Sequence, residues 1–290
     1  MSRPIWLIAA PVIFLVLWSA GFAVAKLGLQ HAPPLTLLAL RYCLVLAVLL
    51  PIAAVLRPPL PKTSRDWLNV AVVGFLIQVV YFGLCYVAFK SGVSAGAVAI
   101  IVCLQPILVA LIAPRFLGDV ISLRGWAGLA LGLAGAVLVI LSRQGVSAEN
   151  GFGIFCAFLA LLGMTGGTLW EKRFGVSHHP VTSNLIQYAV GAAFTLPLAV
   201  ATESLQINWD WHFCLVLVYL VVGNSLLAMS LLLAMIRVGE VSRVSALFYL
   251  VSPLTALCAW PLLGEVMSVL GWAGMALAAL GVALVSRKPC

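Results

Sequence analysis

Polar side chains that could hold a small molecule recur inside the long apolar runs of this sequence. Gln78, Tyr81 and Cys85 are spaced so that all three lie on one face of a helix. A polar group in membrane hydrocarbon is costly unless it faces a cavity or a partner. We therefore predict a neutral cavity, in which aromatic rings stack on a ligand while amides and hydroxyls bind the charged ends of a zwitterion. The predicted substrate-binding residues are Trp18, Ser19, Gln78, Tyr81, Gln105, Tyr219, Asn224, Tyr249 and Ser252.

Each of these residues has a second interpretation, which is a hydrogen bond between two helices worth about 0.6 kcal/mol. Arg41 is a separate case, because it places a charge well inside an apolar run. It could bind a substrate carboxylate, extend toward the outer surface or pair with the carbonyl end of a helix. Its counterpart in the second half of the chain is the uncharged Gln187, so we favour a structural role for Arg41.

Two apolar segments, 100–119 and 247–266, each contain a pair of prolines. Proline inside a helix removes one hydrogen bond and clashes with the preceding turn. Interrupted helices at matching positions of two halves are typical of a transport path, because freed carbonyls at membrane depth need protein or a wet cavity around them. The alternative is that the prolines only kink the helices for packing. The predicted helix breaks, with a gating role, are Pro106, Pro114, Pro253 and Pro261.

Several kinds of chemistry have no support in the sequence. There is no phosphate-binding GxxxxGK[ST] motif, no HExxH and no GxSxG, and the four histidines fall at predicted loops or helix ends. We therefore predict that the protein is not an enzyme and has no catalytic residue, metal site or cofactor. No Asp or Glu falls in the middle of an apolar run, so a proton relay through carboxylates is poorly supported. Energy would come from the substrate gradient or from an ion bound by neutral oxygens.

The elements that must position these residues are membrane-spanning helices. The chain has 290 residues, of which 64% are apolar and 8% are charged, whereas a soluble domain has roughly 25% charged residues. A spanning helix needs about 20 apolar residues. Ten segments meet this requirement, at 6–29, 34–56, 67–89, 94–114, 124–142, 151–170, 181–201, 212–236, 241–261 and 267–286.

The basic residues predict the orientation of these helices. With the N-terminus inside, twelve of the 16 Lys and Arg residues fall at inner loops and helix ends, as the positive-inside rule requires. We therefore predict a multi-pass protein of the cell inner (plasma) membrane with both termini cytoplasmic. The same distribution explains the net charge of +8 without a nucleic-acid partner.

The chain repeats itself. The Asp-Trp pair at 66–67 recurs 144 residues later at 210–211, and the Gly-Trp-Ala-Gly motif at 125–128 recurs 146 residues later at 271–274. Because each copy holds five spans, an odd number, the second copy must enter the membrane from the opposite side. We predict an all-α integral membrane protein with ten transmembrane helices, built as two inverted five-helix repeats, 1–146 and 147–290, around a central cavity. Secondary transporters commonly use such inverted repeats.

A family resemblance adds to this interpretation. Residues 18–22 (WSAGF), the Arg41-Tyr42 pair and the Pro…Pro-x-x-Leu-Gly-Glu segment followed by Gly-Trp-Ala-Gly resemble the ten-helix EamA branch of the drug/metabolite transporter superfamily. Within that branch the chain is most similar to YddG-type exporters of aromatic amino acids. The resemblance implies a basket of helices around a central cavity and the efflux of amino acids or other small metabolites.

We expect a secondary transporter that exports small metabolites, in particular aromatic or neutral amino acids, by alternating access. Its partners would be the small-molecule substrate and the lipid bilayer, and a monomer would suffice. One alternative is an exporter of drug-like or other metabolites. An alternative of another class is a membrane scaffold or enzyme that only inherited the repeat.

Overall fold

The computed structural model describes residues 5–93, 98, 101–102, 104–118, 122–141, 151–175, 178–239, 241–263 and 268–286. These residues form helices and short connections, with no strand among them. In the first half of the chain the helices are α1 (Ile5–Gly28), α2 (Pro34–Leu56), α3 (Ser64–Gly74), η1 (Phe75–Gly83), α4 (Leu84–Lys90), α6 (Gln105–Leu117) and α7 (Leu123–Leu141). In the second half they are α8 (Gly151–Phe174), α9 (Pro180–Thr202), α10 (Trp211–Val218), η2 (Tyr219–Ala228), α11 (Met229–Val238), α12 (Val241–Ala246), α13 (Phe248–Leu263) and α14 (Val269–Ser286).

The predicted all-α membrane fold is confirmed. Six continuous helical segments are long and apolar enough to cross a membrane, and two further apolar helices are shorter. Side chains on the outside of the bundle are apolar, as in Val55, which is 83% exposed, and Leu50, which is 55% exposed. Such a surface is stable in contact with lipid. The six long segments are Ala9–Gly28, Pro34–Leu56, Ser64–Lys90, Gly151–Phe174, Pro180–Thr202 and Trp211–Val238.

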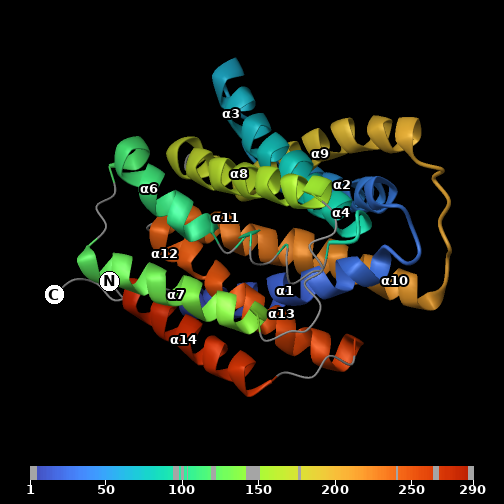
Figure 1. Cartoon of the computed structure of the whole chain (residues 1–290). Helices are drawn as coiled ribbons and strands as arrows, with labels where there is room; N and C mark the ends of the chain where they lie inside the picture. The colour runs from blue at the N-terminus through green and yellow to red at the C-terminus, as the bar shows by residue number, and fades with distance from the viewer. Residues whose placement is uncertain are drawn as a thin grey trace.

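The two halves of the chain pack against each other in a reciprocal way. Helices at matching positions pair with one another, so that α2 lies along α9 and α7 lies along α14 (Figure 1). In the centre α1 packs against η2 and α13 of the second half, while α8 packs against η1 and α6 of the first half. Reciprocal contacts of this kind are the pattern that a two-fold arrangement produces.

The contact between α7 and α14 depends on glycine. A Cβ atom on Gly281 would lie 2.6 Å from the carbonyl oxygen of Gly128 and 2.6 Å from the Cα of Gly132, and one on Gly135 would lie 2.5 Å from the carbonyl oxygen of Gly274. Backbone atoms cannot move aside as a flexible side chain can, so the helices would have to separate. Small residues let helix backbones approach closely in membranes. This close packing matters there because the hydrophobic effect contributes little to helix association in lipid.

Replacing one of these glycines tests the contact. We expect Gly281→Ala to lower the free energy of unfolding by about 1–3 kcal/mol, the usual cost of overpacking, measured by thermal unfolding in detergent. Gly166→Ala in α8 is the matched control, because its Cβ would meet only Leu76 Cδ1 at an ordinary 3.5 Å. Equal stability of the two variants would contradict the backbone-to-backbone contact.

The central helices of the two halves contain the same irregularity. η1 and η2 are π-helical segments, and they begin at Phe75 and Tyr219, which are 144 residues apart. The Asp-Trp pair repeats at the same distance. Long π-helical stretches are rare, and π-turns are frequent at functional sites. The widened turns therefore occur at equivalent places in the duplicated unit.

The first predicted proline break begins a helix. Leu104 forms a turn, and α6 starts at Gln105 with Pro106 in its first turn. Proline is well suited there, because the first N–H groups of a helix have no partner within the helix. Pro114, by contrast, lies inside α6, so the backbone continues past it.

In the second half of the chain the helix is interrupted before the predicted breaks at Pro253 and Pro261. α12 ends at Ala246, Leu247 forms a turn, and α13 then runs through residues 253 and 261 to Leu263. The turn thus comes six residues before Pro253. Helix interiors in membranes tolerate proline when neighbouring groups satisfy the freed carbonyl. The side chains of Ser252, Pro253 and Pro261 are outside the described residues.

Candidate functional site

A small cavity lies where α1, η1, α4 and η2 meet near the buried face of α2. Its volume is about 20 Å³, enough for roughly one water molecule. Most of its wall is aromatic, and its polar lining includes Arg41 and Asn224. The bundle is therefore packed around a space that is smaller than an amino acid. The aromatic lining residues are Trp18, Phe22, Tyr81, Phe82, Tyr86 and Phe89.

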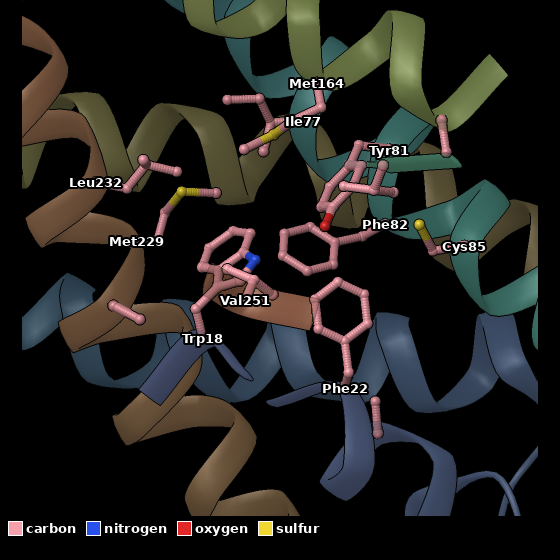
Figure 2. Close-up of a cluster of buried hydrophobic side chains, with 14 of the residues drawn as sticks. Trp18, Phe22, Ile77, Tyr81, Phe82, Cys85, Met164, Met229, Leu232 and Val251 are labelled. Carbon is pink, nitrogen blue, oxygen red and sulfur yellow. The ribbon is translucent and has the colours of Figure 1, made fainter. Parts of the chain in front are cut away.

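Trp18 is the centre of the aromatic wall. Its side chain is 1% exposed, and it stacks on Tyr81 with ring centroids 6.3 Å apart and planes 15° apart. Phe82 and Phe248 contact the same indole ring, with distances between ring centroids of 5.7 and 5.9 Å. Figure 2 shows Trp18 and Phe22 rising from α1 toward Tyr81 and Phe82. A flat apolar or aromatic group could replace one of these ring contacts.

Arg41 places a guanidinium beside this wall. Its Nε donates to Ser225 Oγ at 2.6 Å, its Nη2 to Asn224 Oδ1 at 2.7 Å, and its Nη1 to the Tyr86 hydroxyl at 3.4 Å. The guanidinium carbon also lies 4.6 Å from the centre of the Phe82 ring. Arg41 is 1% exposed, and no carboxylate of the described residues forms an ion pair with it. A buried charge with only neutral partners is costly.

Two tyrosines hold the π-helical segments. The hydroxyl of Tyr42 in α2 donates to the carbonyl oxygen of Gln78 in η1 at 2.7 Å, and the hydroxyl of Tyr188 in α9 donates to the carbonyl oxygen of Ser225 in η2 at 2.9 Å. The two rings contact each other, with centroids 5.6 Å apart. Each hydrogen bond joins a tyrosine of one half to the π-helical segment of the same half, and together they fix both central helices to the α2–α9 pair.

At one end of the bundle, which we call the vestibule end, a second cavity of about 550 Å³ is open to the surface. Lys26, His31 and Lys90 contribute to its lining, and Phe89 lines both this cavity and the central one. No ion pair to either lysine is seen in the part of the chain that the structure describes. The vestibule lining therefore contains two lysines without an ion pair among the described residues, and Phe89 lies between the vestibule and the central cavity.

The acidic groups at the vestibule end bind helix N-termini instead. Glu203 accepts hydrogen bonds from the backbone N–H groups of Leu35 and Thr36, at 3.0 and 2.7 Å. Asp210 caps α10 by accepting from the N–H of Phe213 at 2.7 Å. This hydrogen bond is the main reason why the pKa of Asp210 is lower than its ordinary value. Negative charge at a helix N-terminus is stabilising, so both carboxylates have a structural role as helix caps. Asp210 also lies 3.5 Å from His31 of the vestibule.

The opposite end, which we call the basic end, is held together by polar contacts among the described residues. Arg237 Nε donates to Glu171 Oε1 at 2.6 Å, and its Nη1 donates to the carbonyl oxygen of His178 at 2.7 Å. Lys172 Nζ donates to the carbonyl oxygen of Gly239 at 2.7 Å. These bonds tie the end of α8 to the end of α11, and Glu171 is completely buried.

With this geometry established, comparison with known proteins identifies the family. The model of the EamA-like transporter family matches the chain twice, over residues 4–141 and 151–287. The chain belongs to the EamA-like transporter family. The resemblance noted from the sequence is thereby confirmed, and the two matched ranges lie on either side of the predicted boundary at 146.

Individual relatives span nearly the whole transporter. The uncharacterized inner membrane transporter YedA of Escherichia coli strain K12 is 25% identical over 271 residues, which are 93% of this chain and 87% of that protein. A Salmonella typhimurium protein named a probable amino-acid metabolite efflux pump is 29% identical over 296 residues, 97% of this chain and 94% of its own length. One crystal structure matches with a TM-score of 0.80 at 21% identity, covering 96% of this chain and 95% of its own. That likeness shows the fold alone.

Three residues predicted to line the transporter's cavity meet there, namely Trp18, Tyr81 and Asn224. Gln78 lies one turn away in η1, where it is completely buried. Its backbone carbonyl oxygen accepts from the Tyr42 hydroxyl, and its amide side chain lies close to the Tyr188 hydroxyl.

Two other predicted residues make hydrogen bonds between helices. The Tyr219 hydroxyl donates to the carbonyl oxygen of Leu17 at 2.8 Å. Ser19 is buried, and its backbone carbonyl oxygen accepts from Thr255 Oγ1 at 3.1 Å, while its own hydroxyl has no hydrogen-bond partner among the described residues. Both contacts join α1 to the second half of the chain, but only that of Tyr219 is made by the predicted side chain.

Gln105 and Tyr249 lie away from the central cavity. Gln105 Nε2 is 3.4 Å from Thr168 Oγ1 and 3.5 Å from Ser245 Oγ, so it connects three helices at the start of α6. Tyr249 packs into a separate small core with residues of α6, α7 and α14, close to Gly132. Its helical spacing from Ser245 indicates a shared face, but that face points toward the peripheral helices.

Sequence reasoning missed part of the site. Tyr86 and Phe89 line the central cavity although nothing in their spacing marks them, and Arg41 was given a structural role. The available signal for Arg41 was its charge inside an apolar run. Its partners Asn224 and Ser225 are 183 and 184 residues away, which no local pattern predicts.

Removing a tyrosine hydroxyl tests how the π-helical segments are held. We expect Tyr42→Phe and Tyr188→Phe each to lower the free energy of unfolding by about 1 kcal/mol, and to speed hydrogen exchange in η1 and η2 respectively. Mass spectrometry of exchanged peptides would measure this. Thr202→Val, which removes an exposed hydroxyl bonded within its own helix, is the control. Unchanged exchange in both segments would show that the tyrosines do not restrain them.

The basic end can be tested at its buried ion pair. We expect Glu171→Gln to destabilise the protein by several kcal/mol, because Arg237 keeps a buried charge after its partner is neutralised, a loss of about 3–5 kcal/mol in comparable pairs. Thermal unfolding in detergent is the measurement, with the exposed Arg115→Gln as control. A Glu171→Gln variant as stable as the control would exclude an important role for the pair.

Proposed function

We propose that this transporter exports neutral amino acids with apolar or aromatic side chains across the inner membrane, with both termini in the cytoplasm. The observation that carries the proposal is the central cavity, where stacked rings adjoin a small polar group of Arg41 and Asn224. A zwitterionic amino acid with an apolar side chain presents the same two kinds of surface. The name of the Salmonella typhimurium relative agrees with this substrate class.

We further propose that transport occurs by alternating access between the two ends. The vestibule end is hollow, while the basic end is closed by Arg237, Glu171 and Lys172. Because the two halves make reciprocal contacts, exchanging their shapes would close the first end and open the second, as in other transporters with inverted repeats. The interruptions at Leu104 and Leu247, with Pro106, Pro114, Pro253 and Pro261 nearby, are the proposed places where helices bend. A monomer would suffice for this cycle.

A second candidate is export of drug-like or other metabolites. The mainly aromatic lining of the cavity supports it, because few polar groups are present to select a substrate. A scaffold or enzyme that does not transport has less support, since a closed cavity between two reciprocal halves serves neither role.

Efflux from liposomes tests the proposal. We expect purified protein to release preloaded labelled phenylalanine or tryptophan faster than protein-free liposomes do, and competition by the twenty amino acids to rank those with apolar side chains first. Absence of release for every amino acid would refute the substrate class. Release of unrelated apolar compounds alone would favour the second candidate.

The aromatic wall should determine the affinity for the side chain. We expect Trp18→Ala and Tyr81→Ala to raise the KM for phenylalanine by about tenfold, since an aromatic pair contributes up to about 1.5 kcal/mol beyond area burial. Tyr81→Phe, which keeps the ring, should change the KM little. Phe155→Ala is the control, because Phe155 is 59% exposed on the outer face. Four equal KM values would show that this wall does not contact the substrate.

A further inference from the structure

Arg41 is a charge that the described fold does not neutralise. It is buried in the bundle, and its hydrogen-bond partners are the neutral side chains of Ser225, Asn224 and Tyr86. Ionisable residues within membrane spans are rare, and they usually pair with each other or lie on a substrate path. The two halves of the protein do not both need this charge, because Gln187 stands at the matching position. A purely structural role therefore leaves the cost of the charge unexplained.

The guanidinium also has hydrogen-bonding capacity left. Arginine has five N–H donors. Three of them are directed at Ser225, Asn224 and Tyr86, and the neutral Tyr188 hydroxyl also lies close to the guanidinium. The contact with the Tyr86 hydroxyl is long, at 3.4 Å, beyond the usual 2.7–3.2 Å of an N–H···O bond. The remaining donors belong to the two terminal nitrogens. These are the atoms that form paired hydrogen bonds with a carboxylate.

The protein supplies no obvious anion for this position. Glu171 is paired with Arg237 at the basic end, and Glu203 and Asp210 are bound to helix N-termini at the vestibule end. Across the whole sequence, no Asp or Glu falls in the middle of a predicted span. The counter-ion of Arg41 must then come from outside the chain during at least part of the cycle.

Arg41 borders a place where such an anion could bind. It lines the central cavity together with Trp18, Tyr81 and Asn224, so a carboxylate there would adjoin an aromatic surface. The vestibule lies next to this cavity, because Phe89 lines both, and Lys26 and Lys90 line the vestibule. Clefts lined by one sign of charge raise the local concentration of opposite charge.

We propose that Arg41 binds the carboxylate of the transported molecule, and that a free carboxylate attached to an apolar body is what the site selects. This inference rests on the proposed function and deepens it. Asn224 and Ser225 orient the guanidinium from η2, so they are positioning residues. A carboxylate that binds the remaining donors leaves these bonds to η2 in place, so the guanidinium stays oriented while the ligand is bound.

Wild-type protein allows a test that needs no mutation. Phenylalanine, 3-phenylpropionate and phenylalaninamide share the ring, but only the first two have a carboxylate. We expect phenylalanine and 3-phenylpropionate to compete against efflux of labelled phenylalanine, and phenylalaninamide to compete about tenfold or more weakly, because charge-assisted paired bonds are lost. Equal competition by phenylalaninamide would overturn the role of Arg41 while leaving export intact.

Direct binding separates this inference from the proposed function. If no amino acid is exported, the proposed function fails, and thermal shift of the purified protein with the same three compounds still tests the site. Stabilisation by 3-phenylpropionate and not by phenylalaninamide would support carboxylate binding at Arg41. Equal shifts, or none with either compound, would overturn it.

Variants then assign the effect to Arg41. We expect Arg41→Gln to remove the preference for phenylalanine over phenylalaninamide, and Arg41→Lys to keep part of it, because a lysine has the charge without the planar fork. An Arg41 that only holds helices together would lower transport of both compounds equally and leave their ratio unchanged. Arg115→Gln, exposed on α6, is the matched control. If Arg41→Gln does not fold, the competition by phenylalanine, 3-phenylpropionate and phenylalaninamide on wild-type protein still tests whether the site binds a carboxylate.

Discussion

Tyr42 and Tyr188 donate hydrogen bonds to carbonyl oxygens of the two π-helical segments, and the centre of the protein depends on this pair. In hydrocarbon no water is available to satisfy a backbone group, so each must find a partner within the protein. A π-helical turn is wider than an α-helical one and leaves its carbonyls differently placed. The tyrosines come from α2 and α9, which lie along each other, and so each half of the chain stabilises its own irregular helix at a shared contact.

This arrangement explains why a charge can be kept in the bundle. The segment η2 carries Asn224 and Ser225 side by side, and both side chains reach the guanidinium of Arg41. Phe82 in η1 lies over the same group. Since Tyr188 holds the carbonyl of Ser225, the hydrogen bonds to Arg41 and the irregular backbone are parts of one network. The guanidinium is therefore connected to the backbone of η2 through covalently adjacent residues.

Sequence alone was sufficient for much of the fold, because apolar runs near 20 residues leave few alternatives to spanning helices. The aromatic wall was also partly accessible, since Trp18 and Tyr81 are large rings in such runs. The site residues that could not be predicted depend on distant pairing or on irregular backbone. Arg41 forms hydrogen bonds with residues more than 180 positions away in the sequence. In addition, the residues expected to share one face of an α-helix no longer share it when a π-helical segment changes the number of residues per turn. Tyr249 shows another limit, because amphipathic spacing cannot tell a cavity from a neighbouring helix.

The pairing of α2 with α9 and of α7 with α14 has a consequence for how the chain could be divided. Each pair takes one member from each half, so two separately expressed fragments, cut between residues 141 and 151, would retain complementary interfaces at the periphery as well as at the tyrosine contact. The glycine surface of α7 would recognise α14 with no side chain to rearrange. Such a split transporter would reassemble as a heterodimer, much as two unfused ancestral copies of the five-helix unit would have done.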